Sequence, residues 1–170
     1  MTDQKSTLLA TAIVVFTGVA WGFYWLPVRA MSDLGLPGAW GTLLITGAAA
    51  ILLAPIAMIR RGAILRGDPL ALAALGLGGA AFALYSIGFN YGRVAIIILL
   101  YFLTPVWSTL IGRYVMGWPV SRLRRLAILF GLAGLFVMLG AKGQIPYPRG
   151  SGEWMALVAG ILWSVATTGM

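Results

Sequence analysis

The chain has 170 residues, of which 61% are hydrophobic and only 9% charged, and its formal net charge is +8. Soluble domains carry about 25% charged residues, and a soluble fold has too little polar surface to hide this much apolar area. Uncharged runs of roughly 16 to 26 residues separate small clusters of charge, which is typical of several membrane-spanning helices. The sequence therefore predicts an all-α, polytopic membrane bundle with about six transmembrane helices.

The positive charge does not indicate a nucleic-acid partner, because the Lys and Arg residues occupy short loops beside the apolar runs. In that position they set membrane orientation. The chain has neither Cys nor His, which excludes disulfides, thiol chemistry and Cys/His metal sites. We expect no metal, no cofactor and no enzymatic activity, since the remaining residues offer no nucleophile–base pair and no phosphate-binding loop.

The first apolar run predicts a helix over residues 6–28 that Pro27 and Arg29 end. It is too long for a signal peptide, so we interpret it as a retained span. Gly18 and Gly22 lie four residues apart, a spacing that lets a neighbouring helix backbone approach closely.

The next two runs predict helices over residues 38–59 and 69–89. The second of them is rich in small residues, namely Gly76, Gly78, Gly79, Ala80, Ala81 and Ala83. Small residues favour tight helix packing over lipid exposure, so we expect this helix in the interior of the bundle.

The fourth run begins after Arg93 and continues for about 19 uncharged residues until Arg113, enough to cross a bilayer. Thr104 and Pro105 lie in its middle. Proline removes a helical hydrogen bond, and the freed carbonyl needs a partner, so such a break is buried in protein or lines a cavity. We interpret it as the wall of a polar-tolerant space; an ordinary kinked packing helix is the alternative.

A fifth helix is predicted over residues 126–141, followed by a loop over residues 142–152 and a sixth helix that starts near Glu153. The fifth helix carries another stripe of small residues, Ala127, Gly131 and Gly134. With the N-terminus inside, the cytoplasmic loops hold eight Lys and Arg residues and the outer loops four. This excess predicts a cytoplasmic N-terminus.

Residues 17–22 and 159–164 share the pattern small, Gly, apolar, apolar, Trp, small. Because they lie at corresponding depths of the first and sixth spans, we infer an internal repeat of five helices. An odd number of helices inverts the second copy, a common plan in transporters with a midplane site. We expect residues 1–145 to form the first repeat, and residues 146–170 to form a linker and the first helix of a truncated second repeat.

Several segments together carry a family resemblance: Trp21 followed by Gly22, the corner SIGFNYGRVAIIILLYFLTPVWSTLIGRYVMG, the helix FGLAGLFVMLG and the restart GEWMALVAGILWSV. The chain resembles EamA-type members of the drug/metabolite transporter superfamily. A Gly-Glu pair that is usual after the fourth helix is replaced here by Gly117 and Trp118. The resemblance implies half of a ten-helix, inverted-repeat transporter of the inner membrane. Such proteins export or exchange metabolites, amino acids or drugs through a cavity lined by helices 1, 3, 4 and 6.

The candidates for the substrate path are Trp21, Tyr85, Asn90, Tyr101, Thr104, Pro105, Trp107, Ser108 and Trp163. Trp and Tyr prefer the membrane interfaces, so aromatics at mid-depth indicate either packing or substrate contact. Tyr101, Thr104 and Ser108 have the spacing of one helix face, which suits aromatic or amphipathic solutes and cations. For Asn90 two roles stay open, lining the mouth of the path or capping the turn before Arg93.

Other polar and aromatic residues have plainer interpretations. Belt positions at the membrane interfaces are expected for Tyr24, Trp25, Tyr91 and Trp118. Arg29 and Arg93 are interpreted as snorkelling anchors, with attraction of an anionic substrate as the alternative.

The acids Asp3, Asp33, Asp68 and Glu153 lie in loops or at span ends. A proton-driven cycle usually needs an intramembrane carboxylate, which would then come from a second repeat or a partner subunit. Besides transport, two alternatives stay open: a membrane scaffold without transport activity, and an inactive fragment of a transporter.

Overall fold

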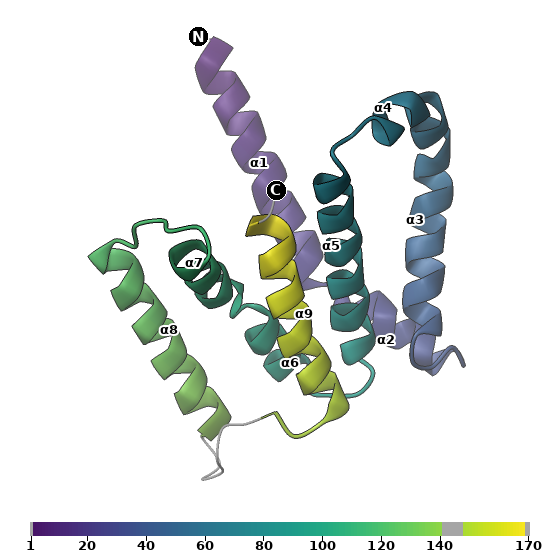
Figure 1. Cartoon of the computed structure of the whole chain (residues 1–170). Coiled ribbons are helices and arrows are strands. Elements are labelled where there is room, and N and C mark those ends of the chain that lie inside the picture. The colour runs from purple at the N-terminus through teal and green to yellow at the C-terminus, as the bar shows by residue number, and fades with distance from the viewer. Residues whose placement is uncertain (1, 141–147, 169–170) are drawn as a thin grey trace.

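The computed structural model describes residues 2–140 and 148–168. In this part of the chain every regular element is a helix. In chain order (Figure 1) the helices are α1 (Thr2–Gly22), α2 (Trp25–Asp33), α3 (Trp40–Ile59), α4 (Arg61–Leu65), α5 (Pro69–Gly88), α6 (Val94–Tyr101), α7 (Thr104–Tyr114), α8 (Arg122–Gly140) and α9 (Ser151–Thr168). The predicted end of the fifth helix at Ala141, most of the following loop and the predicted boundary after residue 145 lie outside the described residues.

Four stretches of the described chain are long and apolar enough to cross a bilayer: Ser6–Asp33, Trp40–Ile59, Pro69–Gly88 and Val94–Tyr114. Together with the helical content, they confirm the predicted class, a polytopic helical membrane bundle. α8 and α9 have 19 and 18 residues. That these two helices also cross the bilayer, which would make six spans, stays a prediction.

Local sequence explains where α5 starts. The side chain of Asp68 accepts a hydrogen bond of 2.9 Å from the backbone nitrogen of Leu70, and Pro69 occupies the first turn. An acidic N-cap followed by proline is a strong start signal, because the cap satisfies a free N–H and the ring fixes φ at a helical value. The structure thus confirms a helix that begins at Pro69.

The predicted end of the first helix is wrong. α1 ends at Gly22, and α2 begins at Trp25, so Pro27 and Arg29 lie inside a second helix. Pro27 occupies the first turn of α2, where a backbone nitrogen has no helical partner to lose. The same proline that terminates one helix is therefore equally compatible with starting the next.

The predicted break in the fourth span is confirmed. α6 ends at Tyr101, α7 begins at Thr104, and Pro105 lies in the first turn of α7. The backbone nitrogens of Val106 and Trp107 both donate to the carbonyl of Leu103, at 2.9 and 3.2 Å. The span is therefore two short helices joined at mid-length.

α9 lies in the middle of the molecule, against α5, α6 and α7 (Figure 1). Small residues permit this close packing. A Cβ added at Gly78 of α5 would lie 3.7 Å from the Trp163 ring of α9, and one added at Gly88 would lie 3.0 Å from the carbonyl oxygen of Gly152. The structure confirms that α5 packs in the interior, with Ala81 and Gly88 buried.

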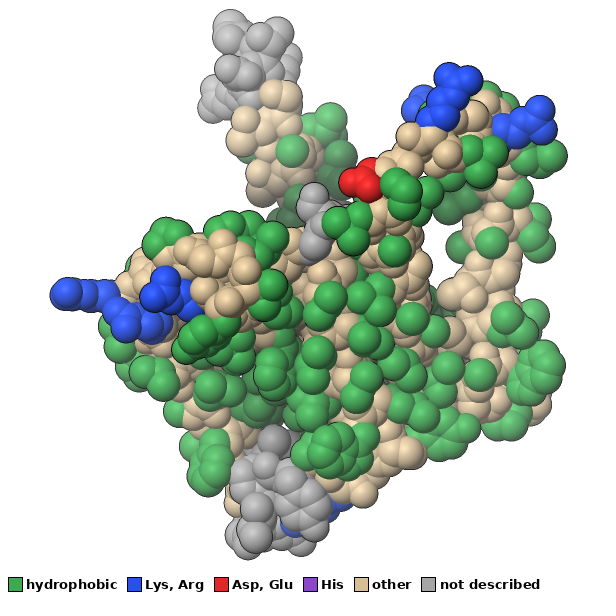
Figure 2. Space-filling model, in the orientation of Figure 1, with side chains coloured by type: hydrophobic (Ala, Val, Ile, Leu, Met, Phe, Trp, Pro, Cys, Tyr) green, Lys and Arg blue, Asp and Glu red, His purple; other side chains and the backbone are tan. Residues whose placement is uncertain are grey.

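The outer helices are apolar but uncovered. α1, α3 and α8 expose most of their large hydrophobic side chains, which form much of the surface in Figure 2. Nothing lies within 4 Å of a Cβ added at Gly18, Gly22, Gly131 or Gly134. The predicted small-residue stripes of the first and fifth helices therefore meet no partner helix within the described chain.

Candidate functional site

Four of the predicted path residues lie in a row of aromatic rings that crosses the molecule. The ring centroids of Trp21 (α1) and Tyr85 (α5) are 6.4 Å apart, those of Tyr85 and Tyr101 (α6) are 4.1 Å apart, and those of Tyr101 and Trp163 (α9) are 6.4 Å apart. Aromatic rings at these separations attract each other. We call these four residues the aromatic row.

Burial divides the aromatic row into two inner and two outer rings. Tyr85 and Tyr101 are only 2% and 6% exposed, whereas Trp21 and Trp163 are each 37% exposed. The inner tyrosines pack among the buried side chains of Phe89, Ile97 and Leu100. Only the two terminal indoles present a free ring surface to a solute.

Tyr24 extends the row at the α1 end, and its place in an interface belt stays a prediction. Its ring stacks on Trp21 at a centroid distance of 5.4 Å and an interplanar angle of 14°, and Phe82 lies 5.7 Å from Trp21. Trp25 is likewise half-buried and packs against the core. Because α1 stops at Gly22, both side chains turn inward instead of staying at the end of a straight span.

Three hydroxyl groups form a cluster beside this end of the row, in which Thr42 and Ser86 are buried and Tyr24 is half-buried. The Ser86 Oγ lies 2.9 Å from the Tyr24 hydroxyl and 2.7 Å from Thr42 Oγ1. The cluster joins the α1–α2 turn, α3 and α5 in a part of the chain where water is scarce, so each hydroxyl depends on the others. No local pattern predicts this cluster, since Thr42 and Ser86 each occupy an otherwise apolar run.

Residues of α9 contact the backbone at the break between α6 and α7. The Ser164 hydroxyl lies 3.2 Å from the carbonyl oxygen of Thr104 and 2.8 Å from that of Gly160, its two acceptors. A Cβ added at Gly160 would lie 2.9 Å from the carbonyl oxygen of Tyr101, so only glycine lets α9 rest on the broken backbone. α9 thus covers one side of the break, while Phe102 and Pro105 stay exposed on the other.

The predicted single face of Tyr101, Thr104 and Ser108 is wrong, because the helix is not continuous between the first two residues. Tyr101 turns into the aromatic row. Thr104, Pro105 and Ser108 instead line a hollow of about 260 Å³ between α7 and α9, together with Arg124, Trp163, Ser164 and Thr167. Trp163 therefore belongs both to the row and to this hollow.

Two further path candidates have unusual polar surroundings. The Trp107 indole nitrogen is buried without a hydrogen-bond partner among the described residues. The Asn90 amide nitrogen donates to the carbonyl of Gly38 at 2.9 Å, and its Oδ1 is buried and unpaired there. Asn90 thus fastens the α5–α6 corner to the α2–α3 turn, instead of capping its own turn.

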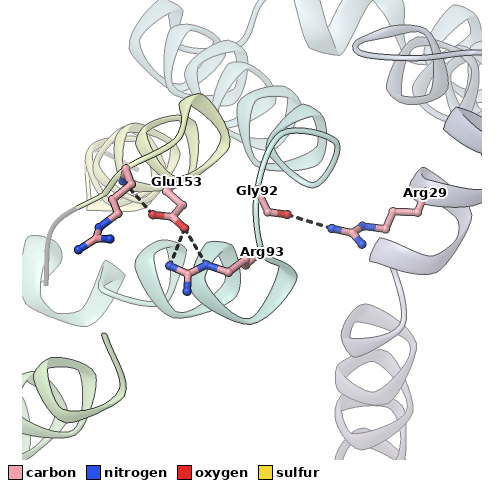
Figure 3. Close-up of polar contacts among 5 residues, drawn as sticks. Arg29, Gly92, Arg93 and Glu153 are labelled. Atoms are coloured by element: carbon pink, nitrogen blue, oxygen red, sulfur yellow. Dashed lines mark hydrogen bonds and ion pairs between the residues drawn. The ribbon is translucent and has the colours of Figure 1, made fainter. Parts of the chain in front are cut away.

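The two outer arginines hold this corner together (Figure 3). Arg29 donates to the carbonyls of Gly92 at 2.9 Å and Phe89 at 3.3 Å. Arg93 pairs with Glu153 at 3.2 Å, and the other carboxylate oxygen accepts the Arg149 backbone N–H at 3.0 Å. Both arginines thus contact the protein, and their roles as snorkelling anchors or as attractors of an anionic substrate stay predictions. Glu153 lies in the first turn of α9, as the sequence predicts, and it is buried there.

The model of the EamA-like transporter family matches residues 8–140. The chain belongs to this family. EamA-like proteins are membrane transporters of small solutes rather than enzymes. Comparisons with curated proteins and with solved structures give no match.

In this EamA-like chain the matched residues include every path candidate except Trp163, which lies on α9. The described residues hold no group of three or more His, Cys, Asp or Glu side chains that could bind a metal. The aromatic row and the hollow beside it offer ring faces, hydroxyls and carbonyl oxygens, groups that make noncovalent contacts.

Proposed function

We propose that this chain exports or exchanges small metabolites, amino acids or drug-like solutes across the inner (plasma) membrane, with its N-terminus in the cytoplasm. It works together with a second five-helix repeat or a partner subunit that completes the cavity. Family membership supports solute transport, and the excess of Lys and Arg in alternate loops supports the orientation.

The observation that carries the proposal is the aromatic row with its two accessible ends. Trp21 and Trp163 occupy the same position of the repeated pattern in α1 and α9 and have the same exposed fraction, 37%. Indole faces attract aromatic rings and cations, and Trp is the strongest of the aromatic side chains in cation–π contacts. We therefore propose that the two indoles form part of the substrate path, and that aromatic or cationic amphipathic solutes are preferred.

The charges of the described chain bear on energy coupling. Glu153 is the buried acid, at 4% exposure, and both of its oxygens accept hydrogen bonds. It fastens α9 to the α5–α6 corner and is not available to exchange a proton for a cation. A proton-driven cycle would thus draw its carboxylate from the second repeat or partner, and without one the protein equilibrates its solute along a gradient.

The test compares transport in inner-membrane vesicles from cells that produce the chain, with a panel of aromatic amino acids and cationic dyes. Trp21→Ala and Trp163→Ala each remove one accessible indole. We expect each to lower transport of the preferred solute about 2- to 13-fold, the range that one aromatic contact of about 0.5–1.5 kcal/mol gives. Tyr101 is a poorer target, because it is buried and its truncation would disturb folding.

The matched controls are Trp40→Ala and Trp154→Ala, which remove equally large side chains that are 59% and 52% exposed and lie outside the row. Both controls should transport like the wild type. If Trp21→Ala and Trp163→Ala also transport like the wild type, the row is not part of the path. If no solute is transported and a partner protein co-purifies in fixed ratio, the scaffold alternative holds instead.

A further inference from the structure

An apolar groove of about 920 Å³ separates α8 from the α6–α7 pair. Its walls include Phe102 and Val106 on one side and Gly131, Gly134 and Leu135 on the other. A Cβ added at Gly131 or Gly134 would have no atom within 4 Å. The volume lies in the range of about 300–1,000 Å³ in which proteins hold organic ligands.

Positive charge gathers at one end of this groove, where α7 is followed by α8 (Figure 2). Arg124 lines the groove itself, and it also lines a second hollow of about 200 Å³ together with Arg113. Among the described residues, one ion pair is found, between Arg93 and Glu153. The guanidinium groups of Arg113 and Arg124 therefore have no acidic partner there.

Three of the hydroxyls around the second hollow already donate to backbone carbonyls. Ser108 donates to the carbonyl of Thr104 at 2.8 Å, Thr109 to that of Pro105 at 2.6 Å, and Thr167 to that of Trp163 at 2.8 Å. Arg113 and Arg124 are the positively charged side chains that line this hollow. Paired guanidinium groups bind phosphate through strong, charge-assisted hydrogen bonds.

We propose that the groove binds an anionic phospholipid, with its phosphate on Arg113 and Arg124 and an acyl chain along α8. Basic pockets between transmembrane helices on the cytoplasmic side hold anionic lipid head groups, and the predicted orientation places this end in the cytoplasm. A transmembrane helix fits the groove less well. An apolar helix brings no negative charge for the arginines, whereas the phosphate of a lipid does.

The test titrates the detergent-purified chain with dioleoyl phosphatidylglycerol, dioleoyl phosphatidylcholine or free oleate, and native mass spectrometry counts the bound molecules. We expect one phosphatidylglycerol per chain, held more tightly than phosphatidylcholine or oleate. Arg124→Gln and Arg113→Gln should each weaken phosphatidylglycerol binding about fivefold, while Arg124→Lys should weaken it less than Arg124→Gln. The control Arg60→Gln removes the same charge beyond α3 and should leave binding unchanged.

A second variant tests the groove without changing charge. Gly134→Leu projects a side chain into the open space of the groove and should reduce phosphatidylglycerol retention, whereas Gly47→Leu on α3, where an added Cβ also meets no atom, should not. Circular dichroism verifies that each variant keeps its helices. Wild-type binding by Arg113→Gln and Arg124→Gln overturns the proposal. So does equal affinity for phosphatidylcholine or oleate, and so does dimerisation that excludes the lipid. None of these measurements depends on transport, so they test this site separately from the proposed function.

Discussion

The contact of α9 with the α5–α6 corner gives the sharpest stability prediction. Gly152 lies in the first turn of α9, and a Cβ added there would overlap the carbonyl oxygen of Gly88. It would also lie 2.8 Å from the carbonyl carbon of Tyr91 and 2.9 Å from the nitrogen of Gly92. All three atoms belong to the backbone, so no side chain can rotate away. In Gly152→Ala, α9 must move away from the corner.

Overpacking of this kind costs about 1–3 kcal/mol. For a protein of this size, that loss lowers the midpoint of thermal unfolding by about 2–12 °C. The measurement is thermal unfolding of the detergent-purified chain, followed by circular dichroism at 222 nm. Because α9 also covers the α6–α7 break, the near-ultraviolet signal of the buried tyrosines should be lost at the same lowered temperature.

The matched control is Gly47→Ala in the middle of α3, where an added Cβ meets no atom within 4 Å. Alanine is favoured over glycine inside a helix by about 0.5–1 kcal/mol, so this variant should melt about 1–4 °C above the wild type. The same chemical change thus has opposite signs at the two sites. A Gly152→Ala chain as stable as the wild type would refute the close approach of the two backbones.

Three further substitutions test polar contacts by the same measurement. Glu153→Gln weakens the ion pair with the α5–α6 corner, and we expect a loss of about 1 kcal/mol, since the partner arginine side chain is 62% exposed and water replaces part of the interaction. Ser164→Ala removes the hydroxyl that reaches the Thr104 carbonyl and should cost about 1 kcal/mol. Ser86→Ala leaves the buried Thr42 hydroxyl without its partner and should cost about 1–3 kcal/mol.

The hydroxyl control for these variants is Thr11→Ala on the exposed α1, whose side chain bonds only to the carbonyl four residues earlier. It should change the unfolding midpoint little. If all three polar variants behave like Thr11→Ala, the buried hydrogen bonds do not stabilise the bundle.

Features that depend on short stretches of chain were predictable from the sequence. The bounds of α3 and α5 follow from uncharged runs between charged residues, and the α6–α7 break follows from Pro105. These outcomes depend on the length of an apolar segment and on one missing N–H, both of which are visible in a few neighbouring residues. The end of α1 was mispredicted because Pro27 has two opposite local meanings, as a stop and as a first-turn residue.

Features that join distant segments were not predictable in the same way. Arg93 and Glu153 are 60 residues apart, as are Thr104 and Ser164, and no local pattern couples the members of either pair. The order of the four rings in the aromatic row could not be predicted from the sequence either, although all four residues were candidates for the substrate path. Which ring is buried and which stays accessible is decided by how α9 packs between α5 and α6, and this is a property of the assembled bundle.

The position of α9 has a consequence for how such proteins are made. The family match ends at residue 140, yet the helix that fills the centre of α5, α6 and α7 comes afterwards in the chain. During translation these three helices enter the bilayer before their partner has been synthesised, with a proline break and a pair of tyrosines still uncovered. We expect the nascent chain to be most vulnerable to membrane proteases in this interval. A ribosome pause before α9 should shorten the lifetime of the product, whereas the same pause after α9 should not.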